Sequence, residues 1–304
     1  MGIFRKIIRR LLRFILNLFS FEWYQRHGYH VLSNHYYSPV PDTSKLVKAD
    51  FEKIIPLNGI DIRENEQLDL ISQFSVKYRK EYDAFPSKQG IDAYIFHTGQ
   101  TSFRSVDSQV LYCMVRSLRP KKMLEVGSGF STMLSAQAIV RNNDEGYPCD
   151  FCAIEPYPNR VIEKGFPGLS ELLRKPVQAV PMAEFSALVA NDILFLDSSH
   201  TVKTGGDVNF EILEILPSLA KGVYIHIHDV FIPYEYPQDW ILKGQRFWAE
   251  QYLLNAFLLY NDSFRIKWMS HYMHRNHSEK LRELMNFYEP GIPYVSSFWM
   301  QKVK

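Results

Sequence analysis

The chain has 304 residues, of which 46% are hydrophobic and 22% are charged, and its formal net charge is +2. This length and composition predict a folded protein with a sizeable core and exclude a disordered or low-complexity chain. Its three cysteines (Cys113, Cys149 and Cys152) form an odd set, which excludes a fully paired disulfide scaffold and favours a cytoplasmic location.

Basic residues are concentrated at the start of the chain. Residues 1–21 contain five of them and no acid. The remaining chain has 30 basic and 33 acidic residues, a balance of about −3. Because a nucleic-acid-binding protein needs a basic face across its fold, we expect no nucleic acid partner. The five basic residues are Arg5, Lys6, Arg9, Arg10 and Arg13.

The same segment, residues 1–21, predicts an amphipathic helix, because its apolar residues recur at helical spacing and the basic residues fill the other face. Its longest apolar run, Phe14–Leu16, is far shorter than the roughly 20 residues that cross a bilayer. One interpretation is a helix in the interface of the cell membrane, on its inner face, with arginines on anionic headgroups. The other is a helix docked on the protein's own body or on a partner subunit, which leaves a homo-oligomer open.

Residues 22–109 form a predicted accessory region that mixes short helical patterns with aromatic loops. In one loop, Pro39 and Pro41 favour an extended backbone beside His35, Tyr36 and Tyr37. These three side chains are candidates for the wall of a substrate site, and packing is the alternative role.

From Pro120 onward, apolar runs and amphipathic segments alternate as in a parallel sheet with crossover helices. The pattern predicts a doubly wound, Rossmann-like α/β domain over residues 110–304, with helices that begin near Ser131, Asn159, Met182 and Val208. The predicted strands are Lys122–Val126, Phe151–Glu155, Val177–Val180, Ile193–Asp197 and Val223–His228.

After the fifth predicted strand, the sequence indicates a long helix over Gln245–Tyr260. Two further runs, Phe264–Trp268 and Tyr294–Gln301, suit a terminal antiparallel hairpin. The aromatic segment Pro233–Trp248 lies where it could cover a pocket as a lid, or it could pack into the core.

A glycine turn follows the first predicted strand, over Gly127–Gly129, and leads into a helix. Two glycines allow the backbone to approach a ligand, and the N–H groups at the helix start can face a carboxylate or phosphate. Ser131 could cap that helix. Thr132 stands where a dinucleotide fingerprint has its third glycine, so the turn favours a methyl donor over NAD.

Glu155 ends the next predicted strand, 28 residues after Gly127. An acidic residue at this place can accept hydrogen bonds from both ribose hydroxyls of an adenosine, which both a methyl donor and NAD contain. The predicted donor site comprises Glu125, Gly127, Ser128, Gly129, Ser131, Glu155 and Asp197.

Two acids, Asp197 and Asp229, follow adjacent predicted parallel strands, at the edge where open α/β sheets bind ligands. They could share a divalent ion, and their oxygen ligands suit magnesium or manganese. His228 is a further candidate ligand, while His200, three residues after Asp197, is a candidate base for a substrate hydroxyl. Each of these residues could instead serve a structural role in a loop or helix cap.

Taken together, the run Glu125–Gly129, Glu155, the loop from Asp197 to His200 and the pair His228–Asp229 resemble class I S-adenosylmethionine-dependent methyltransferases. The resemblance is to bacterial small-molecule O-methyltransferases, in particular the metal-dependent enzymes of macrolide sugars. It covers Val110 to Lys304, and Ser296–Met300 looks like the last strand of that fold. It implies that Asp197 binds magnesium and that His200 acts as the base. Those enzymes carry a second acidic pair where this chain has His228–Asp229.

The sequence thus predicts O-methylation of a sugar or another small hydroxylated metabolite, with S-adenosyl-L-methionine as donor. Two alternatives stay open. One is an NAD-dependent oxidoreductase, and the other is a catalytically inactive, membrane-associated binding protein with a Rossmann domain.

Overall fold

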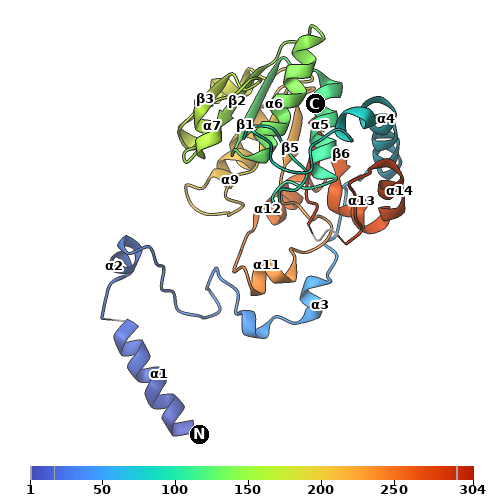
Figure 1. The fold of residues 1–304 in the computed structure, drawn as a ribbon. Coiled ribbons are helices and arrows are strands. Elements are labelled where there is room, and N and C mark those ends of the chain that lie inside the picture. Colours follow the sequence, from blue (N-terminus) through green and yellow to red (C-terminus); the bar gives the residue numbers. More distant parts are fainter. Residues whose placement is uncertain (1, 17, 292–293) are drawn as a thin grey trace.

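The computed structural model describes residues 2–16, 18–291 and 294–304. At its centre is one seven-stranded sheet in the order β3-β2-β1-β4-β5-β7-β6 (Figure 1). The strands are β1 (Lys122–Val126), β2 (Asp150–Ile154), β3 (Glu171–Leu173), β4 (Ile193–Leu196), β5 (Tyr224–Ile227), β6 (Phe264–Met269) and β7 (Phe298–Lys302). The Rossmann-like doubly wound α/β fold predicted from the sequence is therefore confirmed.

The first five strands are parallel, and β7 runs antiparallel between β5 and β6. Val126 at the end of β1 is paired with both Ile154 of β2 and Leu196 of β4, and Leu196 is paired with Ile227 of β5. The carboxyl ends of these four strands therefore meet at one edge. The order of strands reverses between β1 and β4, and open α/β sheets bind ligands at this kind of switch point.

Helices cover both faces of the sheet, which explains the near-continuous apolar strands. Met123 faces the core shared with α5 and α6, while Leu124 faces the core shared with η3 and α12. The helices after β1 are α6 (Phe130–Asp144), α7 (Arg160–Lys164), the short 3-10 helix η2 (Val177–Ala179), α8 (Met182–Ser186), α9 (Asp207–Phe210), the π-helix η3 (Glu211–Ile215), α10 (Leu216–Ser218), α11 (Gln238–Leu242), α12 (Glu250–Leu258), α13 (Ser270–Asn276) and α14 (Ser278–Leu284).

Part of the predicted accessory region packs onto the C-terminal elements. The Tyr82 hydroxyl donates to the Leu284 carbonyl at 2.7 Å, and the Met269 amide donates to Oε1 of Gln67 at 2.8 Å. Helix α5 starts at Asp107, three residues before the predicted boundary at 110, and it packs against α6. The elements before β1 are α1 (Gly2–Leu16), α2 (Phe21–Arg26), η1 (Thr43–Lys45), α3 (Lys48–Phe51), α4 (Glu64–Tyr82) and α5 (Asp107–Leu118).

The predicted strand Val177–Val180 is wrong. These residues form η2 and its C-terminal cap, and the third strand is the short edge strand β3 instead. Val177 and Val180 are both buried while the two residues between them are exposed. A spacing of three between buried side chains suits a 3-10 turn, in which positions i and i+3 lie on the same face.

The long helix predicted over Gln245–Tyr260 is shorter in the structure, where α12 begins at Glu250. Gln245 has a φ of +52°, which helical residues do not adopt, and the Arg246 amide is hydrogen-bonded to the Trp240 carbonyl. The predicted terminal hairpin is confirmed as an antiparallel pair of β6 and β7, although α13 and α14 lie between the two strands in the chain.

The N-terminal helix α1 lies apart from the sheet (Figure 1). Large apolar side chains on α1 are exposed, including Ile7, Leu11 and Phe14. Among the helices of the described residues, none combines the length and the apolar character needed to cross a membrane.

Candidate active site

The glycine turn after β1 brings the backbone close to β4. Gly127 has a φ of +87°, and a Cβ at this position would lie 2.2 Å from the Asp197 carbonyl oxygen. Only glycine fits such a close approach in this conformation. At Gly129, a Cβ would meet nothing within 4 Å, because the residue faces a cavity that it lines.

Ser131 does not cap α6 as predicted. The helix begins one residue earlier, at Phe130, and the Thr132 hydroxyl accepts the Gly129 N–H at 2.9 Å. Ser131 already lies within the first turn, so its hydroxyl donates to Oε1 of Glu125 at 2.6 Å. This contact links the end of β1 to the start of α6.

Two buried polar atoms beside the turn have no hydrogen-bond partner within the described ranges, Oε2 of Glu125 and Oγ of Ser128. Burial raises the pKa of Glu125 to about 8 despite the hydrogen bonds from Ser131 and Thr132. Buried polar atoms are normally paired. Ser128 and Gly129 line the cavity, so the Ser128 hydroxyl is available to a ligand, whereas Glu125 is not among the lining residues described.

Glu155 directly follows β2, at the same edge of the sheet. It is half-buried, and its Oε1 accepts the Tyr157 amide at 2.8 Å. Within the described residues, the side chains that line the cavity on this side are Asn159, Arg160 and Val161, and Glu155 is not among them.

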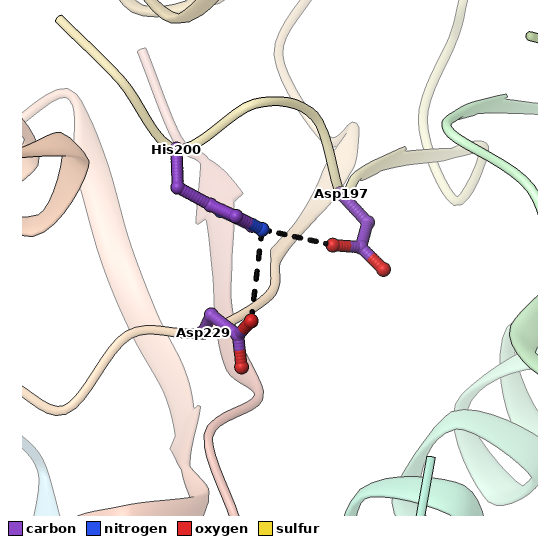
Figure 2. A group of neighbouring side chains, drawn as sticks. All are labelled: Asp197, His200 and Asp229. Atoms are coloured by element: carbon purple, nitrogen blue, oxygen red, sulfur yellow. Dashed lines mark ion pairs between the residues drawn. The ribbon is translucent and has the colours of Figure 1, made fainter. Parts of the chain in front are cut away.

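Three side chains converge where β4 and β5 end (Figure 2). The Nε2 atom of His200 lies 3.2 Å from Oδ1 of Asp197 and 3.6 Å from Oδ2 of Asp229. One atom from each of the three residues can be chosen so that all lie within 4.8 Å of one another. His200 and Asp229 each have a φ of +56°, so both side chains project from left-handed backbone positions. The arrangement provides two carboxylates and one imidazole for a cation.

His228 lies beside this group. Its Nε2 atom is 3.7 Å from Oδ1 of Asp229, and the Phe103 ring packs against it with ring centroids 5.1 Å apart. The Nδ1 atom is buried without a partner in the described part of the chain. Of the two histidines considered from the sequence, the structure therefore places His200 with both acids and His228 against one of them.

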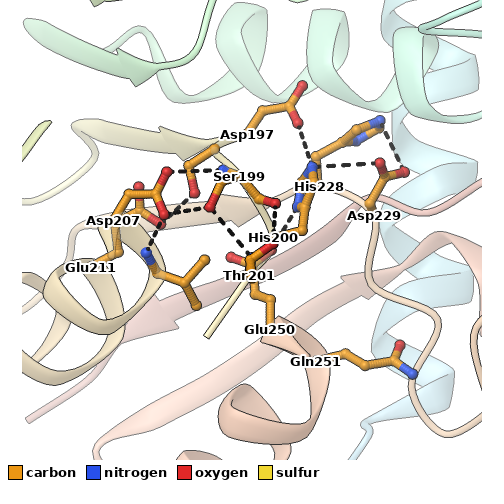
Figure 3. A network of polar contacts seen from close by, with 12 residues as sticks. Asp197, Ser199, His200, Thr201, Asp207, Glu211, His228, Asp229, Glu250 and Gln251 are labelled. Carbon is orange, nitrogen blue, oxygen red and sulfur yellow. Dashed lines mark hydrogen bonds and ion pairs between the residues drawn. The ribbon is translucent and has the colours of Figure 1, made fainter. Parts of the chain in front are cut away.

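Behind His200 stands a carboxylate that sequence reasoning missed, Glu250 at the start of α12. Its Oε2 lies 2.7 Å from Nδ1 of His200, and the His200 carbonyl accepts the amides of Ala249 and Glu250 (Figure 3). The Trp248 ring packs against the imidazole with centroids 4.3 Å apart. Glu250 is 50 residues from His200 in sequence, and no motif links the two.

These contacts determine the protonation of His200. Burial lowers its pKa, but the hydrogen bonds to Asp197 and Glu250 outweigh burial and raise it well above the ordinary value of 6.5. Asp197 shows the reciprocal effect, because the charges of His228 and His200 overcome its burial and lower its pKa to about 2. Within the protein alone, these carboxylates therefore favour the protonated form of His200.

The π-helix η3 places the fully buried Glu211 against the loop that follows β4. Its Oε2 accepts the Ser198 hydroxyl at 2.9 Å, while the Ser199 hydroxyl donates to Asp207 at 2.5 Å (Figure 3). Burial raises the pKa of Glu211 well above its usual range. Both contacts fix the loop that carries Asp197 and His200.

A cavity of about 950 Å³ joins the glycine turn to the two acids. One wall comes from residues 89–104, and the predicted aromatic loop with His35 and Tyr36 is not among the lining residues described. Trp240 and Arg246 of the predicted lid line the opposite side. Its size suits a donor and a small acceptor bound together.

The central part of the chain matches a known protein family. Residues 124–230 match the family model of a methyltransferase domain. An uncharacterized protein from Archaeoglobus fulgidus is 28% identical over 182 residues, which are 56% of this chain and 80% of that protein. Solved structures similar to the chain include an O-methyltransferase from Bacillus cereus with bound SAH, 12% identical with a TM-score of 0.37 over 78% of this chain and 90% of that one. Another is CmcI in its apo form, 16% identical with a TM-score of 0.37 over 66% and 72%.

Residues 124–230 therefore resemble a methyltransferase domain. The match runs from β1 to just past the end of β5 and includes the glycine turn that follows β1.

Proposed function

We propose that the protein transfers the methyl group of S-adenosyl-L-methionine to a hydroxyl of a small molecule, with a sugar as the model acceptor. The observation that carries this proposal is that Asp197 and Asp229 line the same cavity as Ser128 and Gly129 of the donor turn, and that His200 converges with both acids. A hydroxyl bound there would lie between a proton acceptor and the donor.

The donor would be held by the turn at Gly127–Gly129, of which Ser128 and Gly129 line the cavity. Glu125 and Glu155 are not among the lining residues described, and they would approach the donor from the ends of β1 and β2, Glu155 at its ribose. Bound there, the donor supplies a methyl group that its sulfonium already activates. The protein therefore has to align the acceptor oxygen, exclude water and remove a proton.

For the cation, the carboxylates of Asp197 and Asp229 are the proposed ligands, with oxygen chemistry that suits Mg²⁺ or Mn²⁺. His228 lies close enough to Asp229 to orient its carboxylate toward the cation. A divalent ion at this place would polarise the acceptor hydroxyl and offset the carboxylate charge that keeps His200 protonated.

His200 is the proposed base. Glu250 would fix its ring through Nδ1, leaving Nε2 directed at the acceptor side where Asp197 and Asp229 lie. Glu250 acts through His200 and is a positioning residue.

The donor site is tested by calorimetry with S-adenosyl-L-methionine and its demethylated product. We expect Ser128→Ala to weaken binding by about 2- to 10-fold, the effect of losing one neutral hydrogen bond. Ser135→Ala is the matched control, because its hydroxyl is also buried without a partner in the described residues but does not line the cavity.

The same protein is then incubated with isotopically labelled donor and a panel of hydroxylated acceptors, and products are identified by mass spectrometry. Labelled methyl ethers are the expected products. Saturable NADH binding with no response to the methyl donor would instead favour the oxidoreductase, and donor binding without transfer to any acceptor would favour the inactive binding protein.

We further infer that α1 binds an anionic membrane surface. Its apolar side chains are exposed, with 59% of Ile7, 58% of Leu11 and 64% of Phe14 accessible, and its segment carries five basic residues and no acid. Such a helix lies in the headgroup region with its apolar face buried.

Vesicles of anionic lipid should retain the full chain in flotation, and those of neutral lipid should retain less. Each basic residue near the surface contributes about 1 kcal/mol, so retention should decrease with salt. The double variant Leu11→Gln, Phe14→Gln should be released, whereas Leu213→Gln, which changes an exposed leucine of the body, should not. Equal retention of the chain and of a version without residues 1–21 contradicts the inference.

A further inference from the structure

The charged side chains that line the cavity are mainly basic. Three are arginines, Arg104, Arg160 and Arg246. Among the described lining residues, the carboxylates are limited to Asp197 and Asp229, which are already engaged with His200. Apart from the proposed cation site, the cavity therefore presents positive charge.

None of the three guanidinium groups has an acidic partner in the described ranges. Six arginines outside the cavity are paired with carboxylates, whereas no ion pair is found for Arg26, Arg265, Arg275 and Arg282 in the described part of the chain. The paired ones are Arg63, Arg79, Arg116, Arg119, Arg141 and Arg174. Unpaired arginines that face one cavity are a site for an anionic ligand, because the planar guanidinium matches carboxylate and phosphate oxygens.

Arg246 is held in place by aromatic rings. Its guanidinium carbon lies 4.7 Å from the Trp240 ring centroid and 5.1 Å from that of Trp248. Trp248 in turn packs against His200. The stacked guanidinium keeps its N–H groups free at its edge, one ring away from the proposed base.

Arg104 lies in the segment Thr101–Arg104, which lines the same cavity. Its Nε donates to the Thr101 carbonyl at 3.2 Å, which leaves the terminal nitrogens for a ligand. The neighbouring Phe103 packs on His228 and so places this segment beside the end of β5. Arg160 begins α7 next to Asn159, on the donor side beyond β2. Arg104 and Arg246 are therefore the two arginines on the acceptor side.

The charge balance also constrains the acceptor. The carboxylate and the ammonium of the donor cancel, and its sulfonium adds one positive charge, so the donor brings no net negative charge for the two arginines. An anionic acceptor would supply that charge. We propose that the acceptor carries a carboxylate or a phosphate, which Arg246 and Arg104 bind while the hydroxyl to be methylated lies at His200. This inference rests on the proposed function and specifies its substrate class.

The first test measures binding without turnover. Inorganic phosphate, glucuronate and neutral glucose are titrated into the full chain, and its tryptophan fluorescence, to which Trp240 and Trp248 beside Arg246 contribute, is followed. A saturable change in fluorescence is expected with phosphate or glucuronate and not with glucose. Arg246→Gln should weaken anion binding by about 10- to 100-fold, as expected for a lost charged hydrogen bond. Lys243→Gln removes a nearby exposed charge that is paired with Asp239, and it should change nothing.

The second test uses labelled donor with glucuronate, glucose 6-phosphate and glucose as acceptors. Transfer to an anionic member, with KM raised and kcat retained in Arg246→Gln, supports the proposal and identifies the preferred anion. Anion binding that depends on Arg246, in a protein that transfers no methyl group, contradicts the proposed function and leaves the anion site standing. Transfer to glucose as efficient as to the charged sugars, with no effect of Arg246→Gln on binding or KM, overturns the proposal and leaves the methyltransferase function intact.

Discussion

Replacing His200 with alanine is expected to lower turnover by about 10²- to 10⁴-fold, the usual contribution of a positioned base. Donor affinity should stay nearly unchanged, because the imidazole faces the acceptor. Turnover of the unsubstituted protein should rise with pH through the pKa of His200, since only the neutral ring accepts a proton. The neighbouring carboxylates raise that pKa above its ordinary value of 6.5. Where no cation offsets their charge, turnover should therefore increase at a pH above 6.5. The variant should lack this rise.

Because His200 is buried within a polar network, a second variant separates chemistry from folding. His200→Asn keeps an amide that can donate to Glu250, and asparagine tolerates the φ of +56° better than most residues. It should retain the melting temperature and still lose turnover. His30→Ala, which removes an exposed imidazole near α2, is the control. Unchanged turnover in a folded His200→Asn protein would remove the histidine from the mechanism.

Chelation is expected to abolish turnover, and added Mg²⁺ or Mn²⁺ is expected to restore it. Asp229→Asn should reduce Mn²⁺ affinity by about 100-fold or more, since losing even an outer partner of a metal site typically costs 10- to 100-fold. The substitution suits the left-handed backbone at Asp229 and keeps an oxygen for the Ser296 hydroxyl, which donates to Oδ1 at 2.8 Å. Calorimetric titration with Mn²⁺ measures the affinity.

Two controls sharpen this experiment. Asp262→Asn removes an exposed carboxylate that is paired with Lys304, and it should leave Mn²⁺ binding intact. His200→Asn distinguishes a base from a ligand, because a base can be lost while Mn²⁺ still binds, whereas a third ligand cannot. Full turnover in a chelated sample that contains no metal by elemental analysis would exclude the cation from the reaction.

Local sequence signals determined the elements on which the fold depends. The apolar runs of β1, β2, β4 and β5 are buried on both faces, so their composition alone marks them as central parallel strands. The two glycines of the turn were predicted to let the backbone approach a ligand, and the structure shows that Gly127 also accommodates the Asp197 carbonyl. Asp197 and Asp229 were expected to meet because adjacent parallel strands end at one edge, and both now contact His200.

The tertiary structure decided which residues far apart in the sequence contact one another, because spacing along the chain does not report such contacts. Glu250, Trp248 and Arg246 reach His200 or the cavity only because the start of α12 is bonded to the His200 carbonyl, some 50 residues away. The protonation of His200 follows from the same packing, since burial and the surrounding carboxylates set its pKa. At Val177–Val180 the apolar composition suggested a strand. The two valines are instead buried by a 3-10 turn, which composition alone does not distinguish from a strand. Composition and periodicity report which residues are buried, whereas contacts between distant segments determine which charges face one another.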